Sequence, residues 1–318
     1  MLKSLIGNIP NESGLIKKFR FHQGWWRTFV LNEEQGMYWD ERNKKNAWVC
    51  NRINNGDQYP HLKNFLSEEI AREVERALKN HEANGSGIME RDRLYNNLLS
   101  SQPLAFNFFA FFNADKDLAL AFLKTLRSDI TSVEKVVFEH APKTKDHSAF
   151  DFGFIVNTEA GQGFIGFECK YSDTFSFRRK GSIVNYGVDP DKRHKDYHPI
   201  FLANRHRLPD EYLSYVGDKR FNQLFRNELL ALQLNGFNFI ITGLFCHHED
   251  DDAINAGKLF QKKIGNGSSD FILLTYADYF ERMQKLNLTW KQRELVMMLW
   301  ARYCGLDLSK SAQSNYKY

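Results

Sequence analysis

Two apolar, glycine-containing runs lie close together near the middle of this 318-residue chain, and both carry charges. "AFDFGFIV" spans residues 149–156, and "GFIGFECKY" spans residues 163–171. Both are short and rich in aromatic and β-branched residues, and the turn-forming run "NTEAGQ" separates them, which predicts a β-hairpin. Buried strands seldom carry ionised groups, because a charge removed from water must be paired or neutralised. The charges of this hairpin therefore call for a specific explanation.

The register of the hairpin decides which charges share a face. Side chains alternate across a strand, so Glu168 and Lys170 lie on one face of their strand. Pairing residue 156 with residue 163 places Asp151 directly opposite Glu168, and a shift of two residues keeps all three on the same face. Phe150 and Phe152 are expected on the opposite, apolar face.

Opposed carboxylates predict a metal site. Like charges directly opposite each other destabilise a sheet by up to about 1 kcal/mol, and a cation between them removes that cost. Mg²⁺ binds through one or two carboxylates and keeps several waters, while Lys170 can orient or help deprotonate a water molecule. Gly153 and Gly166 predict open space on this face where a phosphate can approach. The alternative is that Asp151 lies in solvent and Glu168 simply pairs with Lys170.

The surrounding pattern predicts an α/β fold with a central mixed β-sheet flanked by helices. Ser67 can cap a helix over residues 68–80, and the "NGSG" run at 84–87 ends it. We therefore expect an aromatic-rich N-terminal extension over residues 1–87 and a larger domain over residues 88–318. Further expected elements include a helical block over about 91–127, strands over 133–140, 237–246 and 270–276, a helix over 221–235, another helix between the last two strands and two amphipathic helices at the end.

These residues resemble the PD-(D/E)XK nuclease superfamily, which has the restriction-endonuclease-like fold. The order of a helix, an antiparallel three-strand meander, a helix and a further strand is visible in the chain. Asp151 matches the family's aspartate and Glu168-Cys169-Lys170 its (D/E)-x-K, although "AFD" stands in place of "PD". The runs "LLSSQPLAFNFF", "FEHAP" and "NQLFRNELLAL" are similar to those of a bacterial group of restriction-endonuclease-like proteins. The resemblance covers about residues 90–235.

The resemblance implies a Mg²⁺-dependent nuclease, with Mn²⁺ as a substitute ion, that hydrolyses phosphodiester bonds in DNA and serves in restriction or defence. Asp151 and Glu168 would hold the metal, and Lys170 would position or activate the attacking water. By the same likeness Glu139 would be a third acid. The alternative for Glu139 is an ordinary exposed glutamate at the end of a strand.

Residues 174–226 carry eleven Lys and Arg against six Asp and Glu. A basic segment beside a metal site suits contacts with a phosphate backbone, although a solvated loop has the same composition. For Gln223 and Arg226, which lie on the expected helix over 221–235, the alternative is a capping or surface pair. The candidate nucleic-acid-binding residues are Arg178, Arg179, Lys180, Arg193, Gln223 and Arg226.

Two other aromatic or charged clusters allow more than one interpretation. Trp25, Trp26, Trp39 and Trp48 either stack on bases or pack a small domain. The run "CHHEDDD" at 246–252 looks like a metal cluster, but we expect Asp251 or Asp252 of this run to cap a helix instead.

Cysteine usage and hydropathy favour a cytoplasmic setting. The four cysteines show no CxxC pair or zinc spacing, and no segment reaches the length of a membrane span or a signal peptide. We expect DNA as the substrate and no membrane partner, and we leave a homodimer open. Two other functions remain open: a nucleic-acid-binding protein of the same fold that does not cut, and a metal-dependent phosphohydrolase for small substrates.

Overall fold

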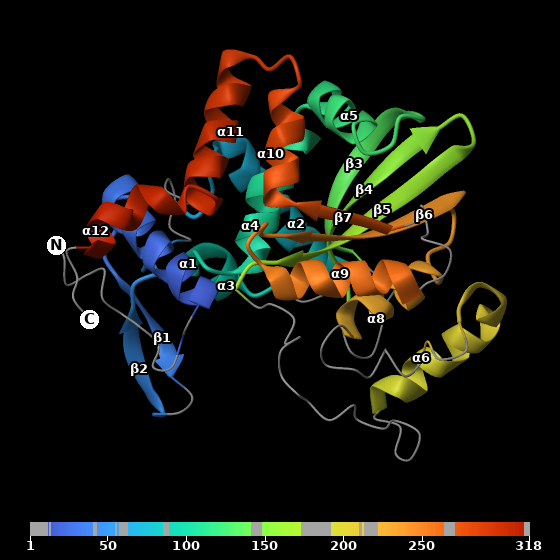
Figure 1. Cartoon of the computed structure of the whole chain (residues 1–318), viewed down its shortest axis with the longest axis horizontal. Helices are drawn as coiled ribbons and strands as arrows, with labels where there is room; N and C mark the ends of the chain where they lie inside the picture. Colours follow the sequence, from blue (N-terminus) through green and yellow to red (C-terminus); the bar gives the residue numbers. More distant parts are fainter. Residues whose placement is uncertain are drawn as a thin grey trace. The chain divides into compact units, whose positions relative to one another are not determined.

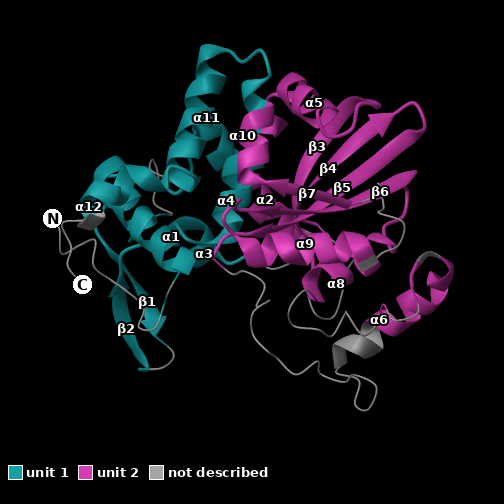
Figure 2. Ribbon diagram, viewed as in Figure 1, with its two compact units in different colours: residues 1–75, 89–111, 283–318 teal, residues 76–88, 112–282 magenta. Residues whose placement is uncertain are grey.

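The computed structural model describes residues 12, 14–40, 43–54, 56, 63–84, 89–140, 148–172, 192–209, 212, 222–263 and 271–314. The chain divides into two compact units, one of residues 1–75, 89–111 and 283–318 and one of residues 76–88 and 112–282 (Figure 2). This division differs from the expected boundary at residue 87, because residues 89–111 and 283–318 cluster with the N-terminal part. Among the described residues, no helix combines the length and apolar character that a membrane crossing requires.

The second unit is built on a five-stranded mixed sheet whose strands follow one another in chain order (Figure 1). β3 (Ile130–His140), β4 (Phe150–Thr158) and β5 (Gly161–Lys170) form an antiparallel meander. β6 (Phe239–Cys246) and β7 (Phe271–Thr275) extend the sheet in parallel. The predicted α/β fold with a central mixed sheet and flanking helices is confirmed.

Aromatic packing fixes the two faces of this sheet. On one face the rings of Phe152 and Phe167 stack 4.9 Å apart, and Phe245 packs against Tyr279, which in turn contacts Phe122. On the other face, side chains of α8 and α9 form a core with those of β6. The helices of this unit are α5 (Lys116–Lys124), α6 (Lys192–Ala203), η4 (Arg205–Arg207), α8 (Asn222–Ala231), α9 (Asp251–Lys263) and α10 (Tyr276–Gln284). α5 and α10 therefore cover the aromatic face, and α8 and α9 cover the face that carries Glu168 and Lys170 (Figure 1).

The first unit joins three separate stretches of chain around buried polar side chains. The Arg302 guanidinium donates to the carbonyl of Asn64 at 2.7 Å, and Gln23 donates to the carbonyl of Arg302 at 2.9 Å. Asn107 donates to the Tyr303 hydroxyl at 2.9 Å. The elements of this unit are α1 (Gly14–Trp25), η2 (Trp26–Val30), β1 (Gly36–Asp40), β2 (Lys45–Val49), α3 (Arg91–Asn96), α4 (Ser101–Phe109), α11 (Trp290–Tyr303), η5 (Leu306–Ser309) and α12 (Lys310–Ser314). α2 (Glu68–Asn84) and η3 (Ala110–Asn113) run from one unit into the other, and so do the last two residues of α10.

Of two helix N-caps predicted from the sequence, the structure has one at the expected residue and the other at a different residue. The Ser67 hydroxyl accepts a hydrogen bond from the N–H of Ile70 at 3.3 Å, as predicted. In "CHHEDDD", Asp250 accepts from the N–H of Ala253 at 3.0 Å, so the expectation of a cap at Asp251 or Asp252 is wrong. Because α9 begins at Asp251, the residue before it is the N-cap.

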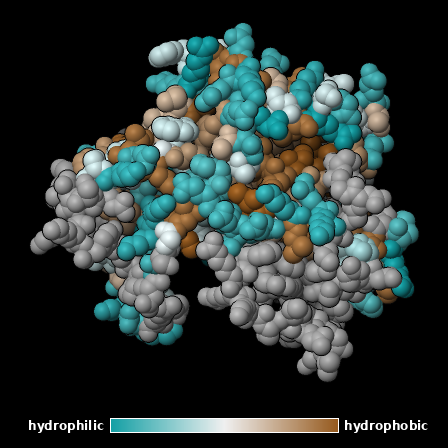
Figure 3. Space-filling model, viewed as in Figure 1, coloured by the Kyte–Doolittle hydropathy of each residue, from teal (hydrophilic) through white to brown (hydrophobic). Residues whose placement is uncertain are grey.

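On the face drawn in Figure 3, hydrophilic residues cover most of the described surface, and hydrophobic ones are visible near the central sheet.

Candidate active site

The hairpin of β4 and β5 brings two carboxylates together. Phe152 pairs with Phe167, so the next residues along the two strands, Asp151 and Glu168, lie opposite each other. This is the register predicted from the sequence, in which residue 156 pairs with residue 163. The register follows from the short turn and from the apolar face, which a shift of one residue would turn outward.

A third carboxylate comes from the neighbouring strand β3. Phe138 pairs with Phe152 and His140 with Phe150, which places Glu139 across from Asp151. Glu139 has a φ of 48°, a left-handed conformation that costs a non-glycine residue about 1–3 kcal/mol and that clusters at functional sites. Three adjacent strands thus each contribute one acid to the same end of the sheet.

Asp151 occupies a strongly acidic environment. It is partly buried, and its Oδ2 accepts a hydrogen bond from the N–H of Cys169 at 2.6 Å. Burial, followed by the negative charges of Glu168 and Glu139, raises the pKa of Asp151 well above its ordinary value, although the Lys170 ammonium and the Cys169 N–H act in the opposite direction. The alternative of an Asp151 in open solvent is therefore not what the structure shows.

Lys170 and Glu168 form a buried ion pair that α8 completes. The Lys170 ammonium donates to Glu168 Oε1 at 2.8 Å and to Gln223 Oε1 at 2.6 Å, and only 2% of Lys170 is exposed. The other carboxylate oxygen of Glu168 accepts from the Asn227 amide at 2.8 Å. Gln223 and Asn227 are four residues apart, which places them on one face of the helix. A buried ion pair needs such additional hydrogen bonds to offset the cost of its desolvation.

Comparison with models of known protein families gives a match for this chain. The model of the PD-(D/E)XK nuclease superfamily matches residues 10–305. The chain belongs to this superfamily. No curated protein and no solved structure matches the chain. The match extends well beyond residues 90–235, and it confirms the resemblance read from Asp151 and Glu168-Cys169-Lys170.

PD-(D/E)XK nucleases generally use divalent metal ions, and the residues present here fit such an ion. Asp151, Glu168 and Glu139 offer only oxygen ligands, which Mg²⁺ and Ca²⁺ prefer. Burial raises the pKa of Asp151 most, and the negative charges of Glu168 and Glu139 raise it further; a bound cation would offset the repulsion among these carboxylates. The donor set and its electrostatics therefore agree with the family's chemistry.

The two glycines beside the acids serve a different purpose from the one expected. A Cβ atom on Gly153 or on Gly166 would lie 2.6 Å from the ring of Phe164, and at Gly166 it would also lie 2.7 Å from the ring of Phe150. The expectation of open space for a phosphate is wrong, because these aromatic rings fill that space. Phe150 also belongs to this face rather than to the opposite one, because its ring packs 5.3 Å from that of Phe164.

The candidate nucleic-acid-binding residues are placed unequally. Gln223 contacts Lys170, and Arg226 lies partly buried on the same helix, α8. Arg193 lies in α6. Residues 178–180 fall outside the described residues. Contacts of these six residues with a nucleic acid stay predictions.

Asn227 is the site residue that the sequence did not single out. It lies within "NQLFRNELLAL", four residues after Gln223, and its side chain is 4% exposed. The available signal in the sequence was this spacing, since two amides at i and i+4 of a helix share a face. Without the packing of α8 on β5, nothing in the sequence shows that this face meets Glu168.

Asn227→Ala is expected to weaken the binding of Mn²⁺ or Mg²⁺ about 10- to 100-fold, because outer-shell partners that orient a ligating carboxylate typically have effects of that size. Calorimetric titration of the protein with the metal ion measures this change in affinity. Asn222→Ala, at the first residue of the same helix, is the matched control and should bind metal as the wild type does. Equal affinities for the Asn227 and Asn222 variants would show that the amide does not orient Glu168.

Proposed function

We propose that this chain is a Mg²⁺-dependent nuclease that hydrolyses phosphodiester bonds in DNA. The observation that carries the proposal is the meeting of Asp151, Glu168 and Glu139 on adjacent strands, with the Lys170 ammonium 2.8 Å from Glu168. The acids would hold the ion, and Mn²⁺ would substitute for Mg²⁺. A bound divalent ion would polarise the phosphate and lower the pKa of a bound water.

The residues of the chain supply the positioning. Gln223 and Glu168 fix the Lys170 ammonium between them, so its three N–H donors have a defined direction. A fixed ammonium can orient the attacking water and offset the negative charge that develops on the phosphate. Asn227 holds the second oxygen of Glu168 and thereby keeps the carboxylate in one orientation. The rings of Phe150 and Phe164 pack 5.3 Å apart on this face of the sheet, beside Gly153 and Gly166.

A direct test uses purified protein with plasmid, linear and single-stranded DNA and with RNA, each in Mg²⁺, Mn²⁺ or EDTA. We expect metal-dependent cutting that is absent in EDTA and lost in Asp151→Asn and Lys170→Met. Cutting that survives both substitutions would refute the assignment of this site. Binding without cutting would favour a silent nucleic-acid-binding protein, and salt-independent turnover of a small phosphodiester alone would favour a phosphohydrolase.

We also propose a restriction-type role in defence, on the likeness of "LLSSQPLAFNFF" and "GFIGFECKYSD" to a bacterial group. Phage should form plaques less efficiently on cells that express the wild-type chain than on cells that express Asp151→Asn at the same level. Equal plating would remove the support for this role and would leave the nuclease assignment intact.

A further inference from the structure

The strand β5 ends at Lys170, and side chains hold this end on both of its sides. The main-chain pairing of β5 with β4 runs as far as Phe167, and its pairing with β6 runs as far as Lys170. At these limits side chains supply the hydrogen bonds. The N–H of Cys169 donates to the Asp151 carboxylate at 2.6 Å, and the carbonyl of Lys170 accepts from the Tyr276 hydroxyl at 2.6 Å. The second of these bonds fixes the main chain of the residue that carries the ammonium group.

Tyr276 reaches Lys170 from beyond the neighbouring strand. Lys170 pairs with Cys246 of β6, and Cys246 pairs with Thr275 of β7. Tyr276 follows Thr275 as the first residue of α10, so its side chain crosses the end of β6 to reach β5. The ammonium of Lys170 lies on the face of the sheet that α8 covers, whereas α10 covers the opposite face (Figure 1). Lys170 is thus bound from both faces, at its ammonium by α8 and at its carbonyl by α10.

Ring packing and helix capping fix the direction of the Tyr276 side chain. The residue is fully buried, and its ring lies 4.6 Å from that of Phe245 and 5.5 Å from that of His247. Across the first turn of α10, the Thr275 hydroxyl accepts from the N–H of Asp278 at 3.1 Å. The Asp278 carboxylate in turn accepts from the N–H of Thr275 at 3.0 Å. This reciprocal pair, like a capping box, fixes where the helix begins. The hydroxyl is therefore directed at the end of β5 before any substrate binds.

A small movement of the main chain at Lys170 would change the place of its ammonium. A group that acts in a reaction must stay within about 0.5 Å of its productive position, and a misplacement of about 1 Å can lower a rate about 100-fold. Glu168 and Gln223 restrain the ammonium itself, but they do not bind the main chain that carries it. A buried carbonyl that loses its donor is costly, so the strand end would shift toward another partner if the hydroxyl were removed.

We propose that Tyr276 is a positioning residue for Lys170. Its hydroxyl holds the main chain at the end of β5, so that the ammonium stays directed at the attacking water. The inference rests on the proposed function, because it gives Tyr276 a part in the same reaction. Removal of the hydroxyl has two effects that can be measured separately: the strand end opens more readily, and the chemical step becomes slower while the binding of metal and DNA stays the same.

The test compares Tyr276→Phe with the wild type in two measurements. Hydrogen exchange of the peptide that covers residues 164–171, without DNA or metal, should be faster in the variant because the end of β5 opens locally. Single-turnover cleavage of a plasmid in saturating Mg²⁺ should be about 10- to 100-fold slower. The half-saturating concentration of DNA and the affinity for Mn²⁺ should not change. 4-Aminophenylalanine in place of Tyr276, whose amino group can donate to the same carbonyl, should restore most of the rate.

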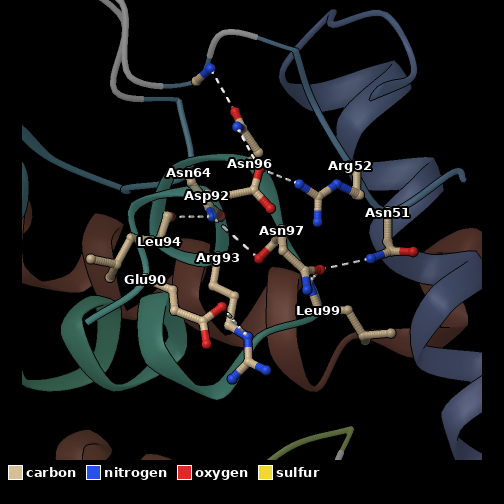
Figure 4. Close-up of polar contacts among 11 residues, drawn as sticks. Asn51, Arg52, Asn64, Glu90, Asp92, Arg93, Leu94, Asn96, Asn97 and Leu99 are labelled. Carbon is tan, nitrogen blue, oxygen red and sulfur yellow. Dashed lines mark hydrogen bonds and ion pairs between the residues drawn. The ribbon is translucent and has the colours of Figure 1, made fainter. Parts of the chain in front are cut away.

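Two control variants separate this role from general stability. Tyr279→Phe removes the hydroxyl of the second buried tyrosine of α10, whose ring packs against Phe245 and Phe122, and it should cut at the wild-type rate. Asn97→Ala removes a side chain of the first unit that accepts from the Asn51 amide at 2.8 Å and from the N–H of Leu99 at 3.0 Å (Figure 4). That variant should be less resistant to urea and should keep the wild-type rate per folded molecule.

A Tyr276→Phe chain that cuts at the wild-type rate would overturn the inference, and so would a slower chain whose hydrogen exchange is unchanged. A slower rate with weaker Mn²⁺ binding, or an equal loss in Tyr279→Phe, would overturn it in favour of a purely structural role of α10. The two measurements also separate this inference from the proposed function. If the wild type cuts no nucleic acid, the proposed function fails, and hydrogen exchange decides whether Tyr276 holds the end of β5. If the wild type and Tyr276→Phe cut equally fast, this inference fails alone.

Discussion

Lys170→Met is expected to lower the rate of DNA cleavage about 100- to 10,000-fold, the usual range for the loss of a positioned proton-transfer group. Methionine keeps the length and the apolar stem of the side chain but removes the ammonium that Glu168 and Gln223 hold. Single-turnover cleavage of a plasmid under saturating Mg²⁺ separates this chemical effect from binding and product release. A variant that cuts within tenfold of the wild-type rate would show that Lys170 takes no part in the reaction.

The same substitution also disturbs folding, so activity needs a stability control. Removing one partner of a buried pair leaves Glu168, 6% exposed, uncompensated, at a cost of about 3–5 kcal/mol. The double variant Lys170→Met/Glu168→Gln removes both charges and should recover much of that loss in urea unfolding. Because it lacks the lysine and one acid, it should remain inactive. A stable double variant without activity attributes the loss to chemistry rather than to unfolding.

Asp151→Asn is expected to stop cleavage and, in the absence of metal, to make the folded protein more stable at neutral and alkaline pH. The pKa of Asp151 is raised in the folded chain, so the folded state binds this proton more tightly than the unfolded state does. The stability that Asp151 contributes is present at acid pH and is lost as the pH rises through the raised pKa. Asparagine carries no charge, so it should recover the stability that the ionised aspartate loses at neutral and alkaline pH.

Urea unfolding between acid and alkaline pH measures this difference, and it should vanish at the acid end, where the aspartate is protonated. Asp129→Asn is a control of opposite sign, because the Arg127 side chain lowers the pKa of Asp129. That variant should be slightly less stable than the wild type at neutral pH, since Asp129 is a largely exposed partner. Saturating Mg²⁺ should stabilise the wild type and leave Asp151→Asn unchanged. An Asp151→Asn chain less stable than the wild type throughout would contradict the raised pKa.

The strands of the sheet could be predicted from the sequence because each of them carries local signals. The alternation of Phe152, Phe154 and Phe167 with polar or small residues fixes which way the hairpin faces, and the short turn fixes its register. The pairing of Asp151 with Glu168 therefore follows from the sequence alone. The left-handed backbone of Glu139 could not be foreseen, since it depends on the strand beside it.

The errors concern space and long-range packing. Gly153 and Gly166 have no side chains, and only the folded chain shows that the Phe164 ring occupies their place. The contact of Asn227 with Glu168 depends on how α8 lies on the sheet, which helical periodicity alone does not give. The composition of the first unit is also a tertiary property, because stretches separated by more than 100 residues cluster there.

The three-part first unit has a consequence for the order in which the chain folds during synthesis on the ribosome. Domains usually fold as they emerge, the N-terminal one first. Here Arg302, which binds Asn64 and Gln23, is translated long after both of them and after the whole β3–β7 sheet. We therefore expect the sheet to fold before the N-terminal residues can pack against residues 283–318, the last segment of their unit. Arrested nascent chains in which a linker brings residue 282 out of the ribosome should protect the sheet from protease and leave residues 14–75 open to cleavage.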